Sequence, residues 1–229
     1  MTSLRKFVLG IGLTFFIPWL CLIVIPHGKM RAATVDTWTD EALAKAYSYP
    51  AGTPNTFRRG HAIYGAEGCA SCHTQMIKPS FMSFESYRPD FGKEGTIEAP
   101  IPVRATLPGD YRGEEFAYLG VQRIGSDLSN VGYRHDAAWH HLHLYNPRAV
   151  RNFSTMPSFR HLYKKQKIRG QRSENALALT GEFDPGEGIE VVPTERAQAL
   201  VEYLLTLKKD AMLPPTEDDA PGDAAEDVK

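Results

Sequence analysis

An uninterrupted apolar run near the amino terminus constrains this chain more than any other feature. It extends from Phe7 to Ile25, has the sequence FVLGIGLTFFIPWLCLIVI and contains no charged residue. As an α-helix, these residues rise about 1.5 Å each and together reach about 30 Å, the thickness of the hydrocarbon core of a bilayer. The sequence therefore predicts a single membrane-spanning helix within an anchor over residues 1–31.

Charges flank the run on both sides. Arg5 and Lys6 precede it, which favours an amino terminus kept in the cytoplasm, whereas Lys29 and Arg31 follow it and weaken that bias. The alternatives are a cleaved signal peptide and a buried helix of a soluble protein. Signal peptides have a shorter apolar stretch, of about 7–15 residues, followed by small residues at the cleavage site. Since this run is longer and ends in proline, histidine and basic residues, we interpret it as an uncleaved anchor.

Composition excludes several classes of protein. The 229 residues include 26 Lys plus Arg and 27 Asp plus Glu, and the net charge of -1 argues against a general nucleic-acid binder. Hydrophobic residues make up 42% and charged residues 23%, which suffices for a packed core and excludes wholesale disorder. Three cysteines cannot form a disulfide-rich scaffold.

The chain beyond the anchor divides into three parts by composition. Residues 32–53 form a connector, in which a short helix is expected over Thr39–Tyr47. Residues 54–212 form the globular domain. Residues 213–229 form an acidic tail without aromatic residues, which is expected to be disordered.

The globular domain is expected to be mainly α with long loops. One helix is expected from Pro54 through FRRGHAIYGAEG, a short one over 137–146, and a third over Thr194–Lys209. Thr194 would cap the third helix, and its last two lysines suit the negative end of the helix dipole. Between Lys78 and Glu115 the sequence has no clear period and predicts a long loop, which in compact domains is commonly functional.

Residues 69–73 form the pattern C-x-x-C-H, with the sequence Cys-Ala-Ser-Cys-His. This spacing lets each thiol add to one vinyl group of a single haem while the adjacent imidazole reaches the iron from the same side. With 3 Cys and 8 His in the chain, composition alone would give this pentapeptide with a probability of about 0.001. A thioredoxin-like dithiol would need a preceding strand and leaves His73 unexplained, and a zinc site would need a second cysteine pair. We predict one covalent haem c, with Cys69 and Cys72 as thioether links and His73 as the proximal iron ligand.

The haem motif and the anchor together indicate the compartment. Haem c is attached on the outer, oxidising side of a bacterial membrane, which settles the orientation that the flanking charges leave open. We therefore expect a single-pass protein of the bacterial inner membrane, with the haem domain on the periplasmic side.

The ligand opposite His73 determines what such a haem does. A methionine there raises the reduction potential and, since both axial positions are then filled, favours electron transfer over substrate binding. Five of the six methionines are poorly placed, because they lie at the anchor, too soon after His73 or beyond the last helix: Met1, Met30, Met76, Met82 and Met212. Met156 remains as the expected distal ligand, and Pro157 biases it away from helical geometry so that its thioether can turn inward. The alternative is that Met156 only fills the hydrophobic core.

Histidines are the rival distal ligands. His140, His141 and His143 follow Trp139, and His135 precedes them. A second histidine ligand would lower the potential and argue against a carrier. Alternatively, each of these histidines lies at the surface or serves only as a hydrogen-bonding group. His140 and His143 are spaced to share one face of a helix, which would lie near either a haem propionate or a partner subunit.

Five segments, in order between about residues 57 and 160, resemble one known family closely. They are EGCASCHTQMIKP at 67–79, IGSDL at 124–128, GYR at 132–134, WHHLHLYNPR at 139–148 and STMPSF at 154–159. The chain resembles the membrane-anchored monohaem cytochrome c subunit, subunit II, of cbb3-type haem–copper oxidases. This resemblance implies a class I-like cytochrome c fold with His73 and Met156 as axial ligands. It also implies a stable complex with a catalytic subunit that carries b-type haems and copper, and with a further c-type cytochrome, as a subunit or a soluble donor.

Two further contacts are expected in a domain of this kind, and one departure from the family pattern puts a third contact in question. In a small cytochrome c the first and last helices cross where a small residue meets an aromatic one, and Gly60 and Tyr203 are the natural pair. Arg148, in the N-P-R segment beside Met156, would bind a haem propionate. The family usually has proline where this chain has Ser126, and that proline helps present a carbonyl to the proximal histidine, so the potential is expected to differ.

Other departures also mark the chain as a divergent member. The loop between Pro79 and Arg123 is longer than usual by around ten residues, and the sequence after Pro157 differs from the common continuation. Between Arg148 and Arg172 the chain has eight basic and no acidic residues. This run has two possible roles. It forms an electropositive face that binds haem propionates, an acidic subunit surface or anionic lipid, or it is a solvated basic loop.

The leading hypothesis is an electron-transfer subunit of a respiratory terminal oxidase, with no catalysis by this chain alone. The alternatives are the small cytochrome c subunit of a nitric oxide reductase and a free-standing membrane-tethered carrier. A haem enzyme or gas sensor would require an open distal position on the iron.

Overall fold

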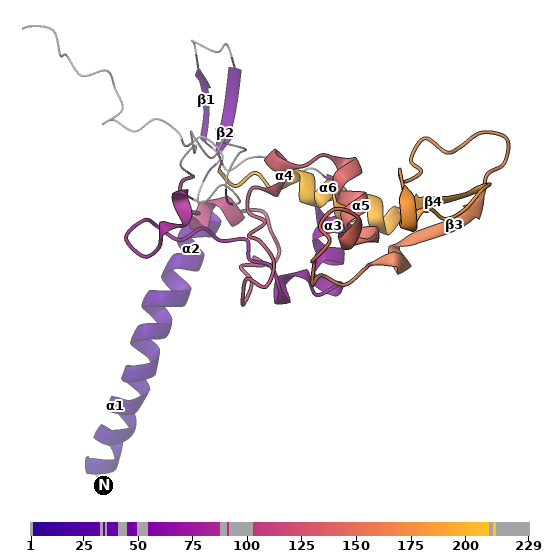
Figure 1. Cartoon of the computed structure of the whole chain (residues 1–229). Helices are drawn as coiled ribbons and strands as arrows, with labels where there is room; N and C mark the ends of the chain where they lie inside the picture. The colour runs from indigo at the N-terminus through magenta and orange to yellow at the C-terminus, as the bar shows by residue number, and fades with distance from the viewer. Residues whose placement is uncertain are drawn as a thin grey trace, which may run out of the picture. The chain divides into compact units, whose positions relative to one another are not determined.

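The computed structural model describes residues 2–32, 34, 36–40, 45–49, 55–87, 91, 103–210 and 213 (Figure 1). The chain forms two compact units. One comprises Met1–Ala51, Pro108–Arg112 and Met212–Lys229, and the other comprises Gly52–Leu107 and Gly113–Ala211. Helices dominate the described residues, and the four strands are short, so the expected mainly α fold with an amino-terminal apolar helix is confirmed.

The apolar run is helical throughout. Helix α1 spans Thr2–Trp19, a π-helical turn covers Leu20–Val24, and α2 continues over Ile25–Ala32. Its side chains are unburied within the structure, and its most apolar window has a mean hydropathy of 2.5. Pro18 lies just before the wider turn, as expected of a residue that removes one backbone hydrogen bond from a helix. In length and composition, the helix can cross a membrane.

The connector contains a hairpin instead of the expected helix. Strands β1, Asp36–Asp40, and β2, Lys45–Tyr49, pair antiparallel, with Asp36 opposite Tyr49 and Asp40 opposite Lys45. The prediction of a helix over Thr39–Tyr47 is therefore wrong. Threonine and aromatic residues are frequent in DTWTD and KAYSY, and they favour strands over helices.

Two helices form the centre of the globular unit. Helix α3, Asn55–Ala66, packs against α6, Glu195–Thr206. A Cβ atom at Gly60 would lie 2.1 Å from the carbonyl oxygen of Ala199 and 2.4 Å from Cβ of Tyr203, so only glycine allows this approach. The predicted contact between Gly60 and Tyr203 is confirmed. The Tyr203 ring is fully buried, with the rings of Phe57 and Tyr64 at 5.0 and 5.4 Å between centroids.

Helix α6 begins as predicted and ends earlier. The Thr194 hydroxyl accepts a hydrogen bond from the Ala197 N–H at 3.4 Å, which confirms the cap. The helix stops at Thr206, and Lys209 lies beyond it, buried, with its ammonium group paired with the Glu114 carboxylate. The expectation that Lys209 acts on the helix dipole is therefore wrong, because a buried charge partner takes its side chain.

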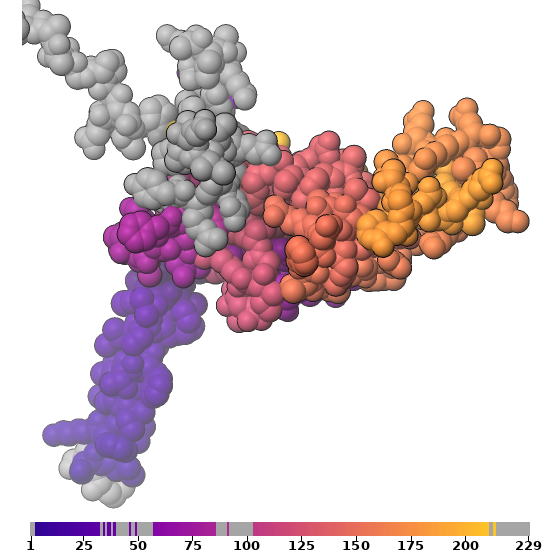
Figure 2. Space-filling model, in the orientation of Figure 1, coloured from indigo at the N-terminus to yellow at the C-terminus, as the bar shows by residue number. Residues whose placement is uncertain are grey.

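Two shorter helices and a second hairpin complete the unit. Helix α4 spans Val131–Arg134, and α5 spans Ala137–Tyr145, which confirms the short helix expected there. Strands β3, Tyr163–Lys167, and β4, Ile189–Pro193, pair antiparallel and project from the helical part (Figures 1 and 2). The sequence did not predict this hairpin. Single 3-10 turns occur at Cys69–Ser71, Phe84–Tyr87, Pro108–Tyr111, Pro147–Ala149, Arg160–Leu162 and Gly181–Phe183.

The described part of the predicted long loop is irregular, as expected. Between Lys78 and Glu115 the described residues include the 3-10 turns Phe84–Tyr87 and Pro108–Tyr111 and contain neither an α-helix nor a strand. A small buried cluster of Ile77, Phe91 and Val103 anchors this loop separately from the main core. The acidic tail, apart from Leu213, lies outside the described residues.

Candidate cofactor site

The C-x-x-C-H motif follows directly from the end of α3. Gly68 has a φ of 73°, a left-handed conformation that ends the helix and turns the chain into the 3-10 turn Cys69–Ser71. The N–H of His73 donates to the carbonyl of Cys69 at 3.0 Å and closes the turn. Cys69, Cys72 and His73 are half-buried, and both thiols are free. The three residues expected to hold haem therefore lie together on one turn.

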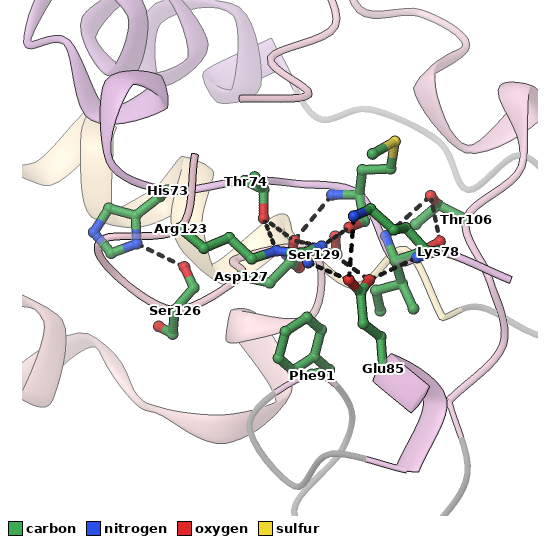
Figure 3. Close-up of polar contacts among 12 residues, drawn as sticks. His73, Thr74, Lys78, Glu85, Phe91, Thr106, Arg123, Ser126, Asp127 and Ser129 are labelled. Atoms are coloured by element: carbon green, nitrogen blue, oxygen red, sulfur yellow. Dashed lines mark hydrogen bonds and ion pairs between the residues drawn. The ribbon is translucent and has the colours of Figure 1, made fainter. Parts of the chain in front are cut away.

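The proton of His73 has a fixed position. Its Nδ1 lies 2.7 Å from the carbonyl oxygen of Ser126 (Figure 3). A carbonyl can only accept, so Nδ1 carries the proton and Nε2 keeps its lone pair for a metal ion. Because the backbone of Ser126 makes this bond, it forms without the family's proline.

Gly125 makes room for the imidazole. A Cβ atom at this position would lie 2.2 Å from Cε1 of His73, and the Gly125 N–H donates to the carbonyl of Cys72 at 2.9 Å. The sequence alone predicts no separate role for Gly125, whose only signal is its place in the IGSDL segment.

Burial changes the protonation of the motif. It lowers the pKa of His73 below its ordinary 6.5, against the opposing effects of the Ser126 bond and the Asp127 charge, so the imidazole is neutral at neutral pH. Burial raises the pKa of Cys69 to about 12, and the charge of Glu67 adds to this effect. A redox-active C-x-x-C motif instead has a lowered cysteine pKa. The thiol environment therefore does not support the thioredoxin-like alternative.

Met156 lies where the Ser-Thr-Met-Pro segment meets the main core. Its side chain is half-buried and packs against the core cluster. Its N–H donates to Oγ of Ser154 at 3.3 Å, and its carbonyl accepts from Nη1 of Arg148 at 3.4 Å. The structure thus brings Arg148 to Met156, as the N-P-R segment suggested. Met82 is exposed, and Met76 has its backbone bound on both sides by the side chains of Asp127 and Arg123.

Three histidines in α5 and just before it contact Trp139. The Trp139 ring stacks with His135, at 3.6 Å and 8° between ring planes, and with His143, at 4.6 Å and 12°. His140 meets Trp139 edge-on at 5.3 Å, and Nδ1 of His141 lies 3.1 Å from the hydroxyl of Tyr163. His141 thus has the hydrogen-bonding role that was one of its alternatives.

Two nitrogens of this stack are buried without a hydrogen-bond partner among the described residues, Nε2 of His140 and Nδ1 of His143. Burial lowers the pKa of His140 to about 3, and the neighbouring histidines add to this effect. Burial likewise lowers the pKa of His143 to about 4, with a further contribution from nearby positive groups, including His73. Both rings are therefore neutral at neutral pH.

The residues present fit a haem. Two free thiols and a neutral imidazole with an available Nε2 share one turn, which is the donor set for covalent attachment and axial ligation. The orphaned nitrogens of His140 and His143 are polar groups that a bound cofactor could satisfy. By contrast, the described residues hold no group of three or more His, Cys, Asp or Glu suited to a separate metal ion.

A protein-family model matches most of the chain. A family model described as cytochrome c oxidase, mono-heme subunit/FixO matches residues 14–184, about three quarters of the chain. The matched range includes most of the apolar run, the C-x-x-C-H motif, Arg148 and Met156. No curated protein matches the chain.

Proposed function

The chain belongs to the FixO family of mono-haem cytochrome c oxidase subunits, and on that basis we propose that it relays single electrons through one covalent haem c to the haem–copper catalytic subunit of a cbb3-type terminal oxidase. The observation that carries this proposal is the hydrogen bond between Nδ1 of His73 and the carbonyl of Ser126, on the same turn as two free thiols. It leaves Nε2 as a neutral donor aimed away from that bond, which is what an axial iron ligand requires.

Each site residue has a defined role. Cys69 and Cys72 would hold the haem covalently, with His73 as the proximal ligand and Met156 as the distal ligand. Arg148, beside Met156, would bind a propionate. The bound haem supplies an iron that changes between two oxidation states one electron at a time.

The protein binds and orients the cofactor and controls access to it. With His73 and Met156 both bound to it, the iron would offer no position to a substrate, and the chain would relay electrons without catalysis of its own. Gly125 and the Ser126 carbonyl fix the imidazole plane.

The anchor and the cofactor support a location and a set of partners. Helices α1 and α2 would hold the domain at the bacterial inner membrane, with the haem on the periplasmic side, where haem c is attached. The catalytic subunit, with b-type haems and copper, would take the electron, and a further c-type cytochrome would give it. The basic run from Arg148 to Arg172, part of it on the exposed strand β3, suits an acidic protein surface or anionic lipid.

Purification through a tag on this chain in mild detergent tests the proposal. A reduced-minus-oxidised spectrum and a metal count should show haem c together with b-type haem and copper. If b-type haem arrives with non-haem iron and no copper, the chain is a nitric oxide reductase subunit; if haem c arrives alone, it is a tethered carrier.

Haem staining of the denatured chain tests the attachment itself. Cys69→Ala and Cys72→Ala together should abolish the stained band. Cys21→Ala is the matched control, because this third cysteine lies in the membrane helix outside the motif, and it should leave the band unchanged. A stained band in the double variant would contradict the assignment of the thioether links.

A further inference from the structure

Two segments run side by side at the proximal histidine. The N–H of Gly125 donates to the carbonyl of Cys72 at 2.9 Å, and the N–H of Leu128 donates to the carbonyl of Thr74 at 2.8 Å. The bond from His73 to Ser126 lies between these two backbone bonds. The orientation of the imidazole therefore depends on the register of one segment against the other.

Asp127 closes this pairing from the buried side. Its side chain is fully buried, and its carboxylate accepts three hydrogen bonds: from Oγ1 of Thr74 at 2.5 Å, from the N–H of Met76 at 3.0 Å and from the N–H of Ser129 at 2.8 Å (Figure 3). Thr74 directly follows His73, and Asp127 directly follows Ser126. The carboxylate thus joins the neighbours of the two residues that share the proximal hydrogen bond.

Arg123 compensates the buried charge of Asp127. Its guanidinium lies 3.7 Å from the Asp127 carboxylate, and its Nε donates to Oγ1 of Thr74 at 2.7 Å. Its Nη2 also donates to Glu85 at 2.9 Å and to the carbonyl of Met76 at 2.5 Å. The Thr74 hydroxyl therefore accepts from Arg123 and donates to Asp127, so its orientation is fixed at both ends.

We infer that Asp127, through Thr74, is a positioning residue for the proximal histidine, and that this contact sets the reduction potential of the bound haem. A partner on the second ring nitrogen orients a ligating histidine and raises its basicity. A more basic ligand stabilises ferric over ferrous iron, so holding His73 against Ser126 keeps the potential lower than it would otherwise be. This inference rests on the proposed function, since it requires His73 to ligate the haem.

Redox titration of the full-length chain in its purified complex tests the inference. Thr74→Val removes the hydroxyl and leaves every charge in place, and it should raise the midpoint potential. Thr74→Ser keeps the hydroxyl and should restore the wild-type value. Asp127→Asn removes the charge as well and should shift the oxidation equilibrium at least tenfold, which is about 59 mV for one electron.

A matched aspartate provides the control. The Asp184 carboxylate also accepts the N–H of the residue two positions on, Gly186, at 2.8 Å, but it is exposed. Asp184→Asn should leave the potential unchanged. In each variant an unchanged ferric methionine–iron charge-transfer band should show that Met156 still ligates, and faster solvent exchange of the His73 Nδ1 proton should accompany the shift in Thr74→Val.

The outcomes separate this inference from the proposed function. If Thr74→Val keeps the wild-type potential, Asp127 does not act through Thr74 and the inference is wrong, whether or not Asp127→Asn folds. A potential that rises equally in Thr74→Val and Thr74→Ser also overturns it, because the hydroxyl is then irrelevant. A wild-type chain without covalent haem would instead refute the proposed function.

Discussion

Replacing Gly60 with alanine tests the contact that places the haem motif. An added Cβ atom would lie 2.1 Å from the carbonyl oxygen of Ala199 and 2.4 Å from Cβ of Tyr203. Neither atom can rotate away, since one belongs to the backbone of α6 and the other is bonded directly to it. In a helix interior alanine is otherwise favoured over glycine by about 1 kcal/mol. Overpacking costs about 1–3 kcal/mol and occasionally more. With two immovable contacts we place the clash at the upper end, for a net loss of about 2 kcal/mol.

Thermal unfolding of the haem-loaded chain in detergent, followed by circular dichroism, measures this loss. At about 2–4 °C per kcal/mol for a domain of this size, the midpoint should fall by about 4–8 °C. Ala62→Gly is the matched control, because residue 62 lies on the exposed side of the same helix and this change carries only the propensity cost of about 1 kcal/mol. If Gly60→Ala is as stable as the wild type, the helices do not approach as described and the reasoning fails.

Three further predictions concern the site and its support. Met156→Ala should change the ferric spectrum and allow ferrous haem to bind carbon monoxide; an unchanged spectrum and potential would show that another residue is the distal ligand. Glu114 and Lys209 form a buried ion pair, with side chains 3% and 6% exposed, so Lys209→Met should cost about 3–5 kcal/mol in urea unfolding. Adding Glu114→Leu should recover much of that cost, and strictly additive losses would contradict the pairing. Burial alone would raise the pKa of Glu85, but hydrogen bonds from Arg123 and a backbone N–H lower it below its ordinary 4.5. The stability that the ionised Glu85 contributes is therefore fully present above pH 4.5 and is lost as the pH falls through its folded pKa. Glu85→Gln should make the free energy of unfolding depend less on pH in acid. An unchanged pH dependence would refute this role of Glu85.

Local patterns explain what the sequence predicted correctly. Helices α3, α5 and α6 have apolar periodicity or a capping residue within their own sequence, as Thr194 illustrates. The haem motif is likewise local, because both thiols and the imidazole occur within five residues. Each of these features depends on neighbours in the chain, and such neighbours are visible without a structure.

Long-range pairing explains what the sequence did not predict. Strand β3 has one buried residue, Tyr163, followed by four exposed polar ones, and it becomes a strand because it pairs with β4, where Tyr163 lies opposite Pro193, thirty positions away. Lys209 suits a helix end by sequence, but the charge that determines its position is Glu114, on a distant loop. In both cases a distant partner outweighs local preference.

The candidate site shows the same division. The sequence identified IGSDL as a segment of interest but gave no role to its carboxylate, because aspartate is rarely fully buried. Asp127 is buried because three donors and Arg123 surround it, and two of these donors, Thr74 and Met76, come from a segment some fifty residues earlier.

The segment from Gly125 to Asp127 also explains why one departure from the family pattern leaves the proximal hydrogen bond intact. His73 bonds to the carbonyl of Ser126, and the side chain of Ser126 is exposed to solvent. The two residues beside Ser126 are constrained. The imidazole ring leaves no room for a side chain at Gly125, and the carboxylate of Asp127 accepts three hydrogen bonds. The site requires the backbone carbonyl of residue 126 to be held in a fixed position. Gly125 and Asp127 can hold it there without a proline between them. Compared with proline, Ser126 therefore makes this segment less rigid in the unfolded chain, and this effect is larger than any change in the hydrogen bond to His73 in the folded chain.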